Sequence, residues 1–274
     1  MTRGHFTTRD GCRLDYVDAG HGLPVLWQHG LGATEAQPAE VFPEAADFRR
    51  ITLECRGHAG SELGPPGQLS LRQFADDALA LLDHLAVPHA VVGGISLGAA
   101  IALRLAVLHP GRVSALILAR PAWVAEPAPE RMRIYVDVAQ LLERFGSEVG
   151  LRHLEATDRF RLLARESPDN AASMRGFFSR DAGSTVALLG RIPVQGPEVS
   201  REQISRLALP TLVIANERDY VHSLAMAEEL AGLIPGARLA IIPAKDANRV
   251  QYIAAFQTAL ADFLSAQRSS TLPP

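Results

Sequence analysis

The passage that most constrains this chain runs from an apolar strand into an alanine-rich helix at residues 91–100, Val-Val-Gly-Gly-Ile-Ser-Leu-Gly-Ala-Ala. It places Ser96 in a Gly-x-Ser-x-Gly sequence at the strand-to-helix turn, the pattern of a nucleophile elbow. A serine at the tip of so sharp a turn has strained backbone, and side chains at Gly94 and Gly98 would collide with neighbouring backbone. Ser96 is therefore the candidate nucleophile, and the Leu97 N–H at the helix N-terminus is the candidate donor to a developing oxyanion.

Composition narrows the class of protein and the class of partner. The 274 residues, 47% hydrophobic and 21% charged, predict a globular chain with one large domain and an insertion. A net charge of −3 gives no reason to expect nucleic acid or an anionic membrane as partner, so we expect a small organic substrate. No apolar run approaches the roughly 18 residues that span a bilayer, and the first residues lack the apolar core of a signal peptide. We therefore expect a cytoplasmic protein.

The remaining chemistry-bearing side chains give weaker signals. Cys12 and Cys55 fall on expected strands, and we interpret them as buried reduced thiols rather than a disulfide, which a cytosolic chain rarely keeps. The spacing of the histidines indicates no metal site, and no cofactor is expected. The oligomeric state stays open.

The order of apolar segments predicts the fold class. An antiparallel opening is expected around the Asp10-Gly11 turn dipeptide, and from residue 24 apolar strands alternate with helices. This alternation predicts an α/β fold with a mostly parallel, doubly wound sheet and helices on both faces. The expected strands are 25–28, 50–53, 90–95, 113–119, 211–215 and 238–242. The expected buried stripe of the last helix is Val250, Ile253, Phe256, Leu260, Phe263 and Leu264.

The alternation stops between residues 122 and 207, where we expect several helices broken by Gly146, Pro168, Gly183, Pro193 and Pro197. We interpret this segment as a helical lid inserted into a core made of residues 1–121 and 208–274. The lid would cover the carboxyl edge of the sheet, where ligands bind in open α/β sheets. Its apolar members either line a pocket or hold the lid helices together; they are Trp123, Phe160, Phe177, Phe178, Leu188 and Leu189.

Four segments, in order along nearly the whole chain, resemble the α/β-hydrolase superfamily. Residues 29–32 (His-Gly-Leu-Gly) look like its oxyanion turn, residues 56–61 (Arg-Gly-His-Ala-Gly-Ser) are similar to its Arg-Gly-x-Gly-x-Ser loop, residues 94–98 form the elbow, and residues 216–219 (Asn-Glu-Arg-Asp) end a strand as its acid does. The resemblance implies Ser96 as nucleophile, the Leu31 and Leu97 N–H groups as oxyanion hole, and Asp219 as the orienting acid. It also implies that His29 and His58 brace their own loops.

The resemblance fails at one position. The family takes its catalytic histidine from just after the last strand, where this chain has Lys245, Asp246 and Asn248 and no histidine. A free carboxylate, with a pKa of about 4, is a weak base, and a lysine with a pKa of about 10 is protonated unless it is strongly desolvated. Neither is a ready substitute for imidazole.

The nearest replacement in sequence is His222, three residues after Asp219 at the expected start of a helix. A helix N-terminus disfavours the imidazolium form, whereas Asp219 favours it. To act as the base, His222 would have to come within about 3 Å of Ser96. The alternative is that it only hydrogen-bonds Asp219 or the lid, in which case Asp219 would serve as a helix cap or lid partner.

These features predict a serine hydrolase that acts on a small carboxylic ester, thioester or lactone through an acyl-enzyme on Ser96, with His222 as an atypical base. Two alternatives stay open, the first of them because of the missing distal histidine. One is a non-hydrolytic protein of the same fold that binds a small apolar ligand, and the other is a cofactor-free lyase or isomerase that uses the oxyanion hole.

Overall fold

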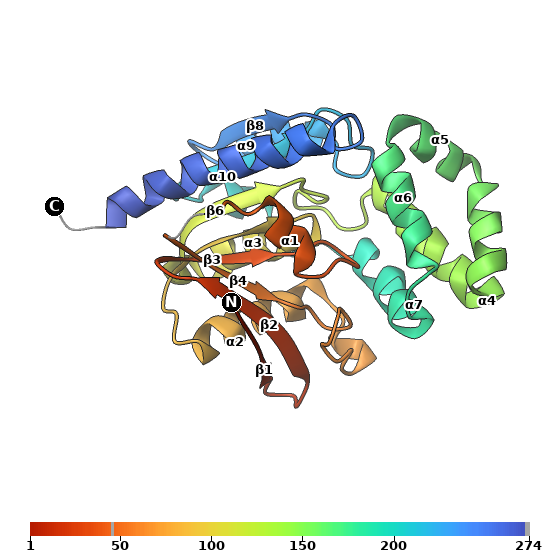
Figure 1. Ribbon diagram of the computed structural model, residues 1–274, viewed down its shortest axis with the longest axis horizontal. Helices are drawn as coiled ribbons and strands as arrows, with labels where there is room; N and C mark the ends of the chain where they lie inside the picture. The colour runs from red at the N-terminus through yellow and green to blue at the C-terminus, as the bar shows by residue number, and fades with distance from the viewer. Residues whose placement is uncertain (45–46, 272–274) are drawn as a thin grey trace.

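The structure is a computed structural model that describes residues 1–44 and 47–271. Its centre is an eight-stranded sheet with the order β1-β2-β4-β3-β5-β6-β7-β8 (Figure 1). The first two strands are antiparallel to their neighbours and the remaining six are parallel, which confirms the predicted mostly parallel α/β sheet. The strands are β1 (Thr2–Thr7), β2 (Arg13–Gly20), β3 (Leu23–Gln28), β4 (Phe48–Leu53), β5 (Ala90–Ile95), β6 (Val113–Ala119), β7 (Thr211–Asn216) and β8 (Arg238–Ile242).

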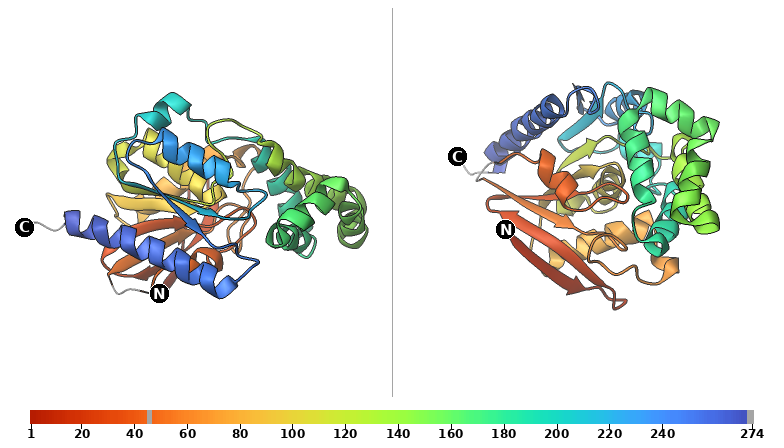
Figure 2. Two further views of the ribbon diagram at one scale, coloured as in Figure 1. Left: turned by 90° about the horizontal axis from the view of Figure 1, so that it is seen from above. Right: turned by 45° about the vertical axis from the view of Figure 1, so that its right-hand side comes forward.

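Helices cover both faces of this sheet. One face packs against the first and last helices and the other against the three remaining core helices, so that α10 lies on one side of the strands (Figure 2). The core helices are α1 (Ala36–Val41), α2 (Leu71–His84), α3 (Leu97–Leu108), α9 (Leu224–Leu233) and α10 (Arg249–Thr271). Ser70 caps α2 by accepting a hydrogen bond from the Gln73 N–H.

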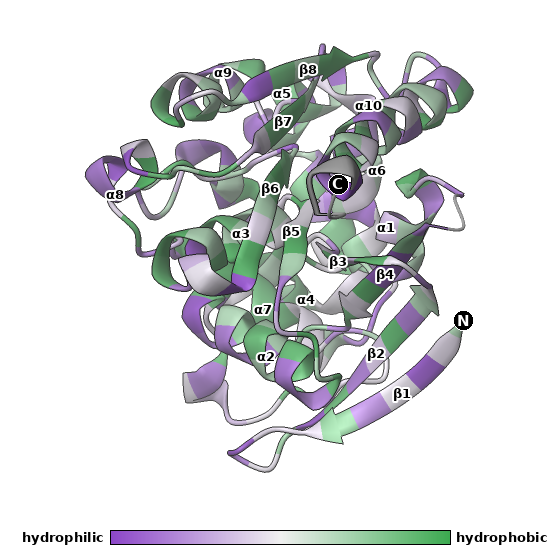
Figure 3. Ribbon diagram, turned by 90° about the vertical axis from the view of Figure 1, so that its left-hand side faces the viewer, coloured by the Kyte–Doolittle hydropathy of each residue, from purple (hydrophilic) through white to green (hydrophobic). Residues whose placement is uncertain are grey.

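The alternation of side chains along each strand produces the two cores. On β3, Val25 and Trp27 face α10, whereas Leu26 between them faces α2 and α3. Hydrophobic residues are concentrated on the adjacent strands β5, β6 and β7 (Figure 3). Strands buried on both faces are continuously apolar, which is why the sequence signals them so clearly.

β1 and β2 pair antiparallel as expected, with residues 8–12 connecting them. Cys12 and Cys55 are buried free thiols, as predicted. The expectation for Val250 was wrong: this residue is 77% exposed, and the buried stripe begins at Tyr252. Val250 is two residues before Tyr252, about 200° around the helix, so it faces away from the buried side.

Four helices between β6 and β7 form a separate layer beyond one end of the sheet (Figures 1 and 2). They are α4 (Arg133–Glu155), α5 (Asp158–Glu166), α6 (Pro168–Phe177) and α7 (Ala182–Arg191). Gly146 kinks α4 and Pro168 begins α6, but Gly183 lies inside α7 and does not break it. The following short helix α8 (Arg201–Ser205) contacts α9 in the core. The division into core and lid at residues 122 and 207 stays a prediction.

None of the helices in the described ranges is both long enough and apolar enough to cross a bilayer.

The elbow glycines give the first testable prediction. A Cβ on Gly98 would lie 2.5 Å from the Gln28 carbonyl oxygen, so Gly98→Ala must displace backbone. We expect it to lower the free energy of unfolding by about 1–3 kcal/mol in urea titrations. The control is Gly232→Ala in α9, where a Cβ meets open space; we expect no loss and up to about 1 kcal/mol of gain. Equal stability of Gly98→Ala and the parent would contradict this account.

Candidate active site

The candidate nucleophile lies where β5 passes into α3. Ser96 has φ 56° and ψ −106°, a conformation that L-residues rarely adopt, and α3 begins at the next residue. Gly94 and Gly98 pack against each other and against the Gln28 backbone. A Cβ atom at either position would lie only 2.5–2.7 Å from these backbone atoms. The glycines are therefore required by close approach of backbone, as the sequence predicted.

His222 reaches the serine. Its Nε2 lies 2.8 Å from the Ser96 Oγ, and its Nδ1 lies 3.0 Å from both carboxylate oxygens of Asp219. In the neutral ring whose Nδ1–H is donated to Asp219, Nε2 is the nitrogen that can accept a hydrogen bond from the serine hydroxyl. Asp219 also accepts a hydrogen bond from the His222 backbone N–H at 3.0 Å, a turn that an aspartate readily forms with residues shortly after it in the chain. Because of this turn, the imidazole of His222 can contact Asp219 although it is only three residues further along the chain.

A buried arginine holds the other side of Asp219. The Arg120 Nε and Nη2 lie 2.8 and 2.7 Å from the Asp219 Oδ2. Burial alone would raise the pKa of Asp219, but the Arg120 guanidinium and the hydrogen bonds from His222 outweigh it and hold that pKa well below its ordinary value. The carboxylate is therefore ionised and fixed in direction.

The oxyanion turn after β3 is held by side chains. The Gly30 N–H donates to the Gln37 Oε1 at 2.7 Å, and the Gly32 N–H donates to the His58 Nε2 at 2.9 Å. Leu31 lies between these two anchors and borders the same pocket as Ser96. The Leu97 N–H is in the first turn of α3, where N–H groups have no acceptor within the helix. Both candidate donors are thus on rigid backbone next to the serine.

His29 and His58 are structural in this geometry. The His29 Nδ1–H donates to the Gly30 carbonyl, and its Nε2 accepts the Cys55 N–H. The His58 Nδ1–H donates to the Arg56 carbonyl. Burial lowers the pKa of His29 to about 4, and burial together with the neighbouring His29 lowers that of His58 to about 3. Both rings stay neutral at physiological pH and brace the loops.

The loop of residues 56–61 is anchored through its arginine. The buried Arg56 guanidinium bonds Asp77 of α2 and Asp10 of the first hairpin. Ser61 accepts the Asp15 N–H and donates to the Glu54 carbonyl. This loop places His58 next to Gly32, whose N–H it accepts. The segment that resembles the family's loop therefore supports the oxyanion turn.

The three polar residues after β8 have separate partners. The Lys245 Nζ lies 2.8 Å from the Asp169 Oδ1 of α6, the Asp246 Oδ2 lies 2.6 Å from Arg218, and the Asn248 Oδ1 accepts the Gln251 N–H at the start of α10. Of the three, only Lys245 borders the pocket. The place where the family resemblance predicts the base is therefore taken by an ion pair to the lid.

The pocket above Ser96, which we call the inner pocket, has a volume of about 100 Å³. Its wall includes Leu31, His222, Arg120 and Tyr135. Next to it lies an outer pocket of about 500 Å³ between the oxyanion turn and α7. Phe177 and Arg180 line both pockets, and the Arg180 guanidinium lies over the Phe177 ring and donates to the Gly32 carbonyl. These two side chains belong to the wall that the inner and outer pockets share, with Gly32, Ala33 and Gln37.

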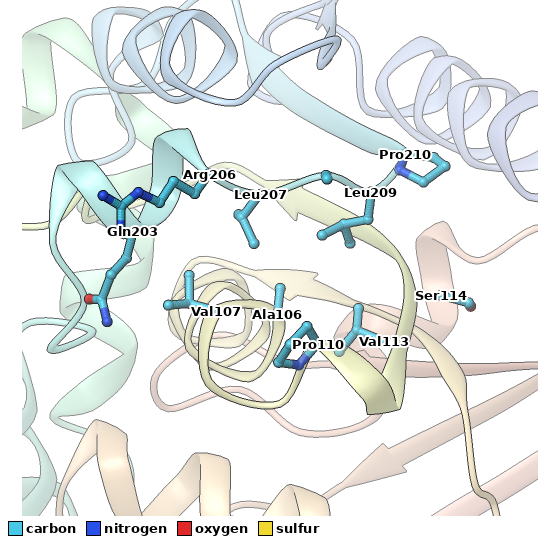
Figure 4. A pocket seen from close by; sticks show the side chains of 11 residues that line it. Ala106, Val107, Pro110, Val113, Ser114, Gln203, Arg206, Leu207, Leu209 and Pro210 are labelled. Carbon is cyan, nitrogen blue, oxygen red and sulfur yellow. The ribbon is translucent and has the colours of Figure 1, made fainter.

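A cavity of about 490 Å³ lies elsewhere, between the end of α3 and the chain before β7 (Figure 4). Val113 and Pro210 place it at the amino ends of β6 and β7, opposite the edge that carries Ser96. None of Ser96, Asp219 and His222 lines this cavity, so we do not assign it to the candidate active site.

The lid side chains divide between the two expected roles. Phe177, Leu188 and Leu189 line the outer pocket, and all six candidates are buried. Trp123 donates its indole N–H to the Gln195 carbonyl, and Phe160 lies under the Arg175 guanidinium. These two residues hold the lid segment in place.

Sequence reasoning missed Arg120, Asp169, Asn170 and Gln37. Arg120 follows directly after β6, and a charged side chain at the carboxyl end of a buried strand is a usable signal, since the strand ends meet at one edge. The two α6 residues carry no such signal, because their approach to the core depends on how the lid docks. Among the residues that the structure describes, no three His, Cys, Asp or Glu side chains gather as a metal site requires.

With this geometry in view, the chain belongs to the alpha/beta hydrolase fold family, whose model matches residues 24–248. It is 28% identical over 268 residues to the 2-hydroxymuconate semialdehyde hydrolase of Pseudomonas sp. (strain CF600), covering 93% of this chain and 91% of that protein. It is 29% identical over 213 residues to 3-oxoadipate enol-lactonase 2 of Acinetobacter baylyi (strain ATCC 33305 / BD413 / ADP1), covering 77% and 76%.

Among solved structures, a hydrolase from Pseudomonas aeruginosa PA01 matches with a TM-score of 0.73 at 25% identity, covering 96% of this chain and 98% of that one. These relatives are hydrolases, which supports hydrolysis as the class of reaction.

The buried histidines give a prediction for stability against pH. The pKa of His58 is about 3 when folded and about 6.5 when unfolded, so the unfolded chain binds more protons between these values. The contribution of the neutral His58 ring to the free energy of unfolding is complete above pH 6.5 and is lost as the pH falls toward 3. We expect the change in unfolding free energy from pH 7 to pH 5 to be about 1–2 kcal/mol smaller in His58→Gln than in the parent.

Urea unfolding at the two pH values measures this difference, and His21→Gln at an exposed position is the control. An identical pH dependence in His58→Gln and the parent would refute the neutral buried imidazole.

Proposed function

We propose that this protein is a serine hydrolase that cleaves a small carboxylic ester, thioester or lactone through an acyl-enzyme on Ser96, with His222 as the general base. The observation that carries the proposal is the 2.8 Å contact between the His222 Nε2 and the Ser96 Oγ, with Asp219 behind the ring. Nucleophile, base and orienting acid then stand in hydrogen-bond reach in sequence order Ser-Asp-His.

The proposed reaction has two halves. The Ser96 Oγ attacks the carbonyl carbon while its proton passes to the His222 Nε2, and the negative oxygen is stabilised by the Leu31 and Leu97 N–H groups. The imidazolium returns the proton to the leaving alcohol, thiol or lactone oxygen as the carbonyl reforms. Water then attacks the acyl-enzyme with the same proton path, which releases the acid and restores Ser96.

The size of the inner pocket supports a small acyl group. A volume of about 100 Å³ is well below the roughly 300–1,000 Å³ of sites for drug-sized ligands. The name of the Acinetobacter relative, an enol-lactonase, supports lactones as one member of the proposed class. The non-hydrolytic alternative started from the missing histidine after β8, and in this proposal His222 supplies that base.

The role of the triad predicts the behaviour of two variants. We expect a fluorophosphonate probe to label the parent at Ser96, located by peptide mass spectrometry, and Ser96→Ala to remove the label. We expect His222→Gln to lower kcat/KM on p-nitrophenyl acetate by about 1,000-fold or more, because removal of a triad base costs several orders of magnitude. His21→Gln is the matched control. An unlabelled parent, or full activity in His222→Gln, would refute the proposal.

The wall between the two pockets predicts substrate length. Phe177→Ala should join the inner and outer pockets and raise the ratio of kcat/KM for hexanoate over acetate esters by about tenfold or more, since each buried methylene contributes to binding. Phe178→Ala is the control for loss of a buried lid aromatic, because Phe178 is buried and lines neither pocket. An unchanged ratio in Phe177→Ala would exclude Phe177 as the barrier.

A further inference from the structure

The residues proposed as acid and base share one short connection. Asp219 and His222 both lie between β7 and α9, in residues 217–223, which belong to neither a helix nor a strand. In the position implied by the family resemblance, the base would instead follow β8. Two residues that carry the proton chemistry thus depend on one irregular segment, so the contacts that hold this segment matter to the reaction.

A lid residue makes one of those contacts. Asn170, in the first turn of α6, is buried, and its Oδ1 accepts the backbone N–H of Val221 at 3.0 Å. Val221 is fully buried and immediately precedes His222. A buried N–H without an acceptor costs about 1–3 kcal/mol, so this bond favours one path of the connection.

The neighbouring lid residue, Asp169, is linked to Asp219 through Arg120. The Asp169 Oδ2 lies 3.5 Å from the Arg120 Nη2, and Arg120 in turn holds the Asp219 Oδ2. The Asp169 Oδ1 pairs with Lys245 in the loop after β8 at 2.8 Å. The amino end of α6 is thereby tied to the ends of β6, β7 and β8 at once.

We propose that Asn170, assisted by Asp169, is a positioning residue that makes the lid helix α6 part of the proton-transfer apparatus. When α6 is docked, Asn170 fixes the backbone one residue before His222 and so fixes the distance from the imidazole to Ser96. This inference rests on the proposed function and adds to it: the base is in place only while α6 is docked. Asn170 and Phe177 of the same helix border the inner pocket, so one helix both encloses the substrate and completes the site.

The test compares Asn170→Ala with the conservative Asn170→Asp, which keeps an oxygen acceptor for the Val221 N–H. Active sites are first counted by fluorophosphonate titration, so that kcat is expressed per reactive Ser96. We expect Asn170→Ala to lower kcat by about tenfold to 100-fold with KM changed less than about threefold, as a displacement of about 1 Å in a catalytic group does. We expect Asn170→Asp to recover most of the loss.

The matched control is Asp158→Ala, a fully exposed side chain on the adjacent lid helix α5, which should leave kcat and KM unchanged. If Asn170→Ala does not fold, as judged by circular dichroism, Asp169→Asn replaces it in the same comparison. It removes the ion pairs to Lys245 and Arg120 at almost equal volume, and we expect about a tenfold loss in kcat.

The outcomes separate this inference from the proposed function. A parent that the probe does not label would overturn the proposed function itself. A labelled, active parent whose kcat is unaffected by Asn170→Ala, or a loss that appears only in KM or in the number of titrated sites, would overturn the positioning role alone.

Discussion

The Asp219 carboxylate is the charge on which the site depends. It is buried, accepts both the ring N–H and the backbone N–H of His222, and is neutralised from the other side by Arg120. A buried charge is tolerated only when it is paired and hydrogen-bonded, so loss of one of these partners would leave the Asp219 charge uncompensated. Asp219 directs the imidazole toward Ser96, while Arg120 keeps the carboxylate ionised and limits how far it can turn.

The sequence predicted what local patterns encode. The strands followed from apolar runs, and the elbow followed from glycines that leave room for the Gln28 backbone. Whether His222 would reach Ser96 depends on the path of an irregular connection, and no periodicity describes such a path. Asn170 was missed for a related reason, since its contact with Val221 joins the lid to the core across a long stretch of chain. The wrong expectation for Val250 arose because the buried face of α10 is centred on Tyr252 and Phe256, and Val250 lies outside that face although it is apolar.

The position of the imidazole changes which parts of the fold must be rigid. A base after β8 would rest on a strand end and on α10, but here Lys245 occupies that loop and pairs with Asp169 of the lid. His222 instead sits in the turn that its own acid organises, and the lid holds the residue before it. In our account the acid, the base and the lid therefore form one mechanical unit, and the oxyanion turn forms a second unit braced by His58 and Gln37.

The pH dependence of covalent labelling tests most directly whether His222 removes the proton from Ser96. The rate of fluorophosphonate reaction at Ser96 would be measured across the pH range in which the fold is stable, in the parent and in His222→Gln. If His222 is the base, the parent rate rises with pH through one ionisation, as the neutral base forms, and this step is absent in the slower variant. The same ionisation step in both proteins would contradict this role of His222.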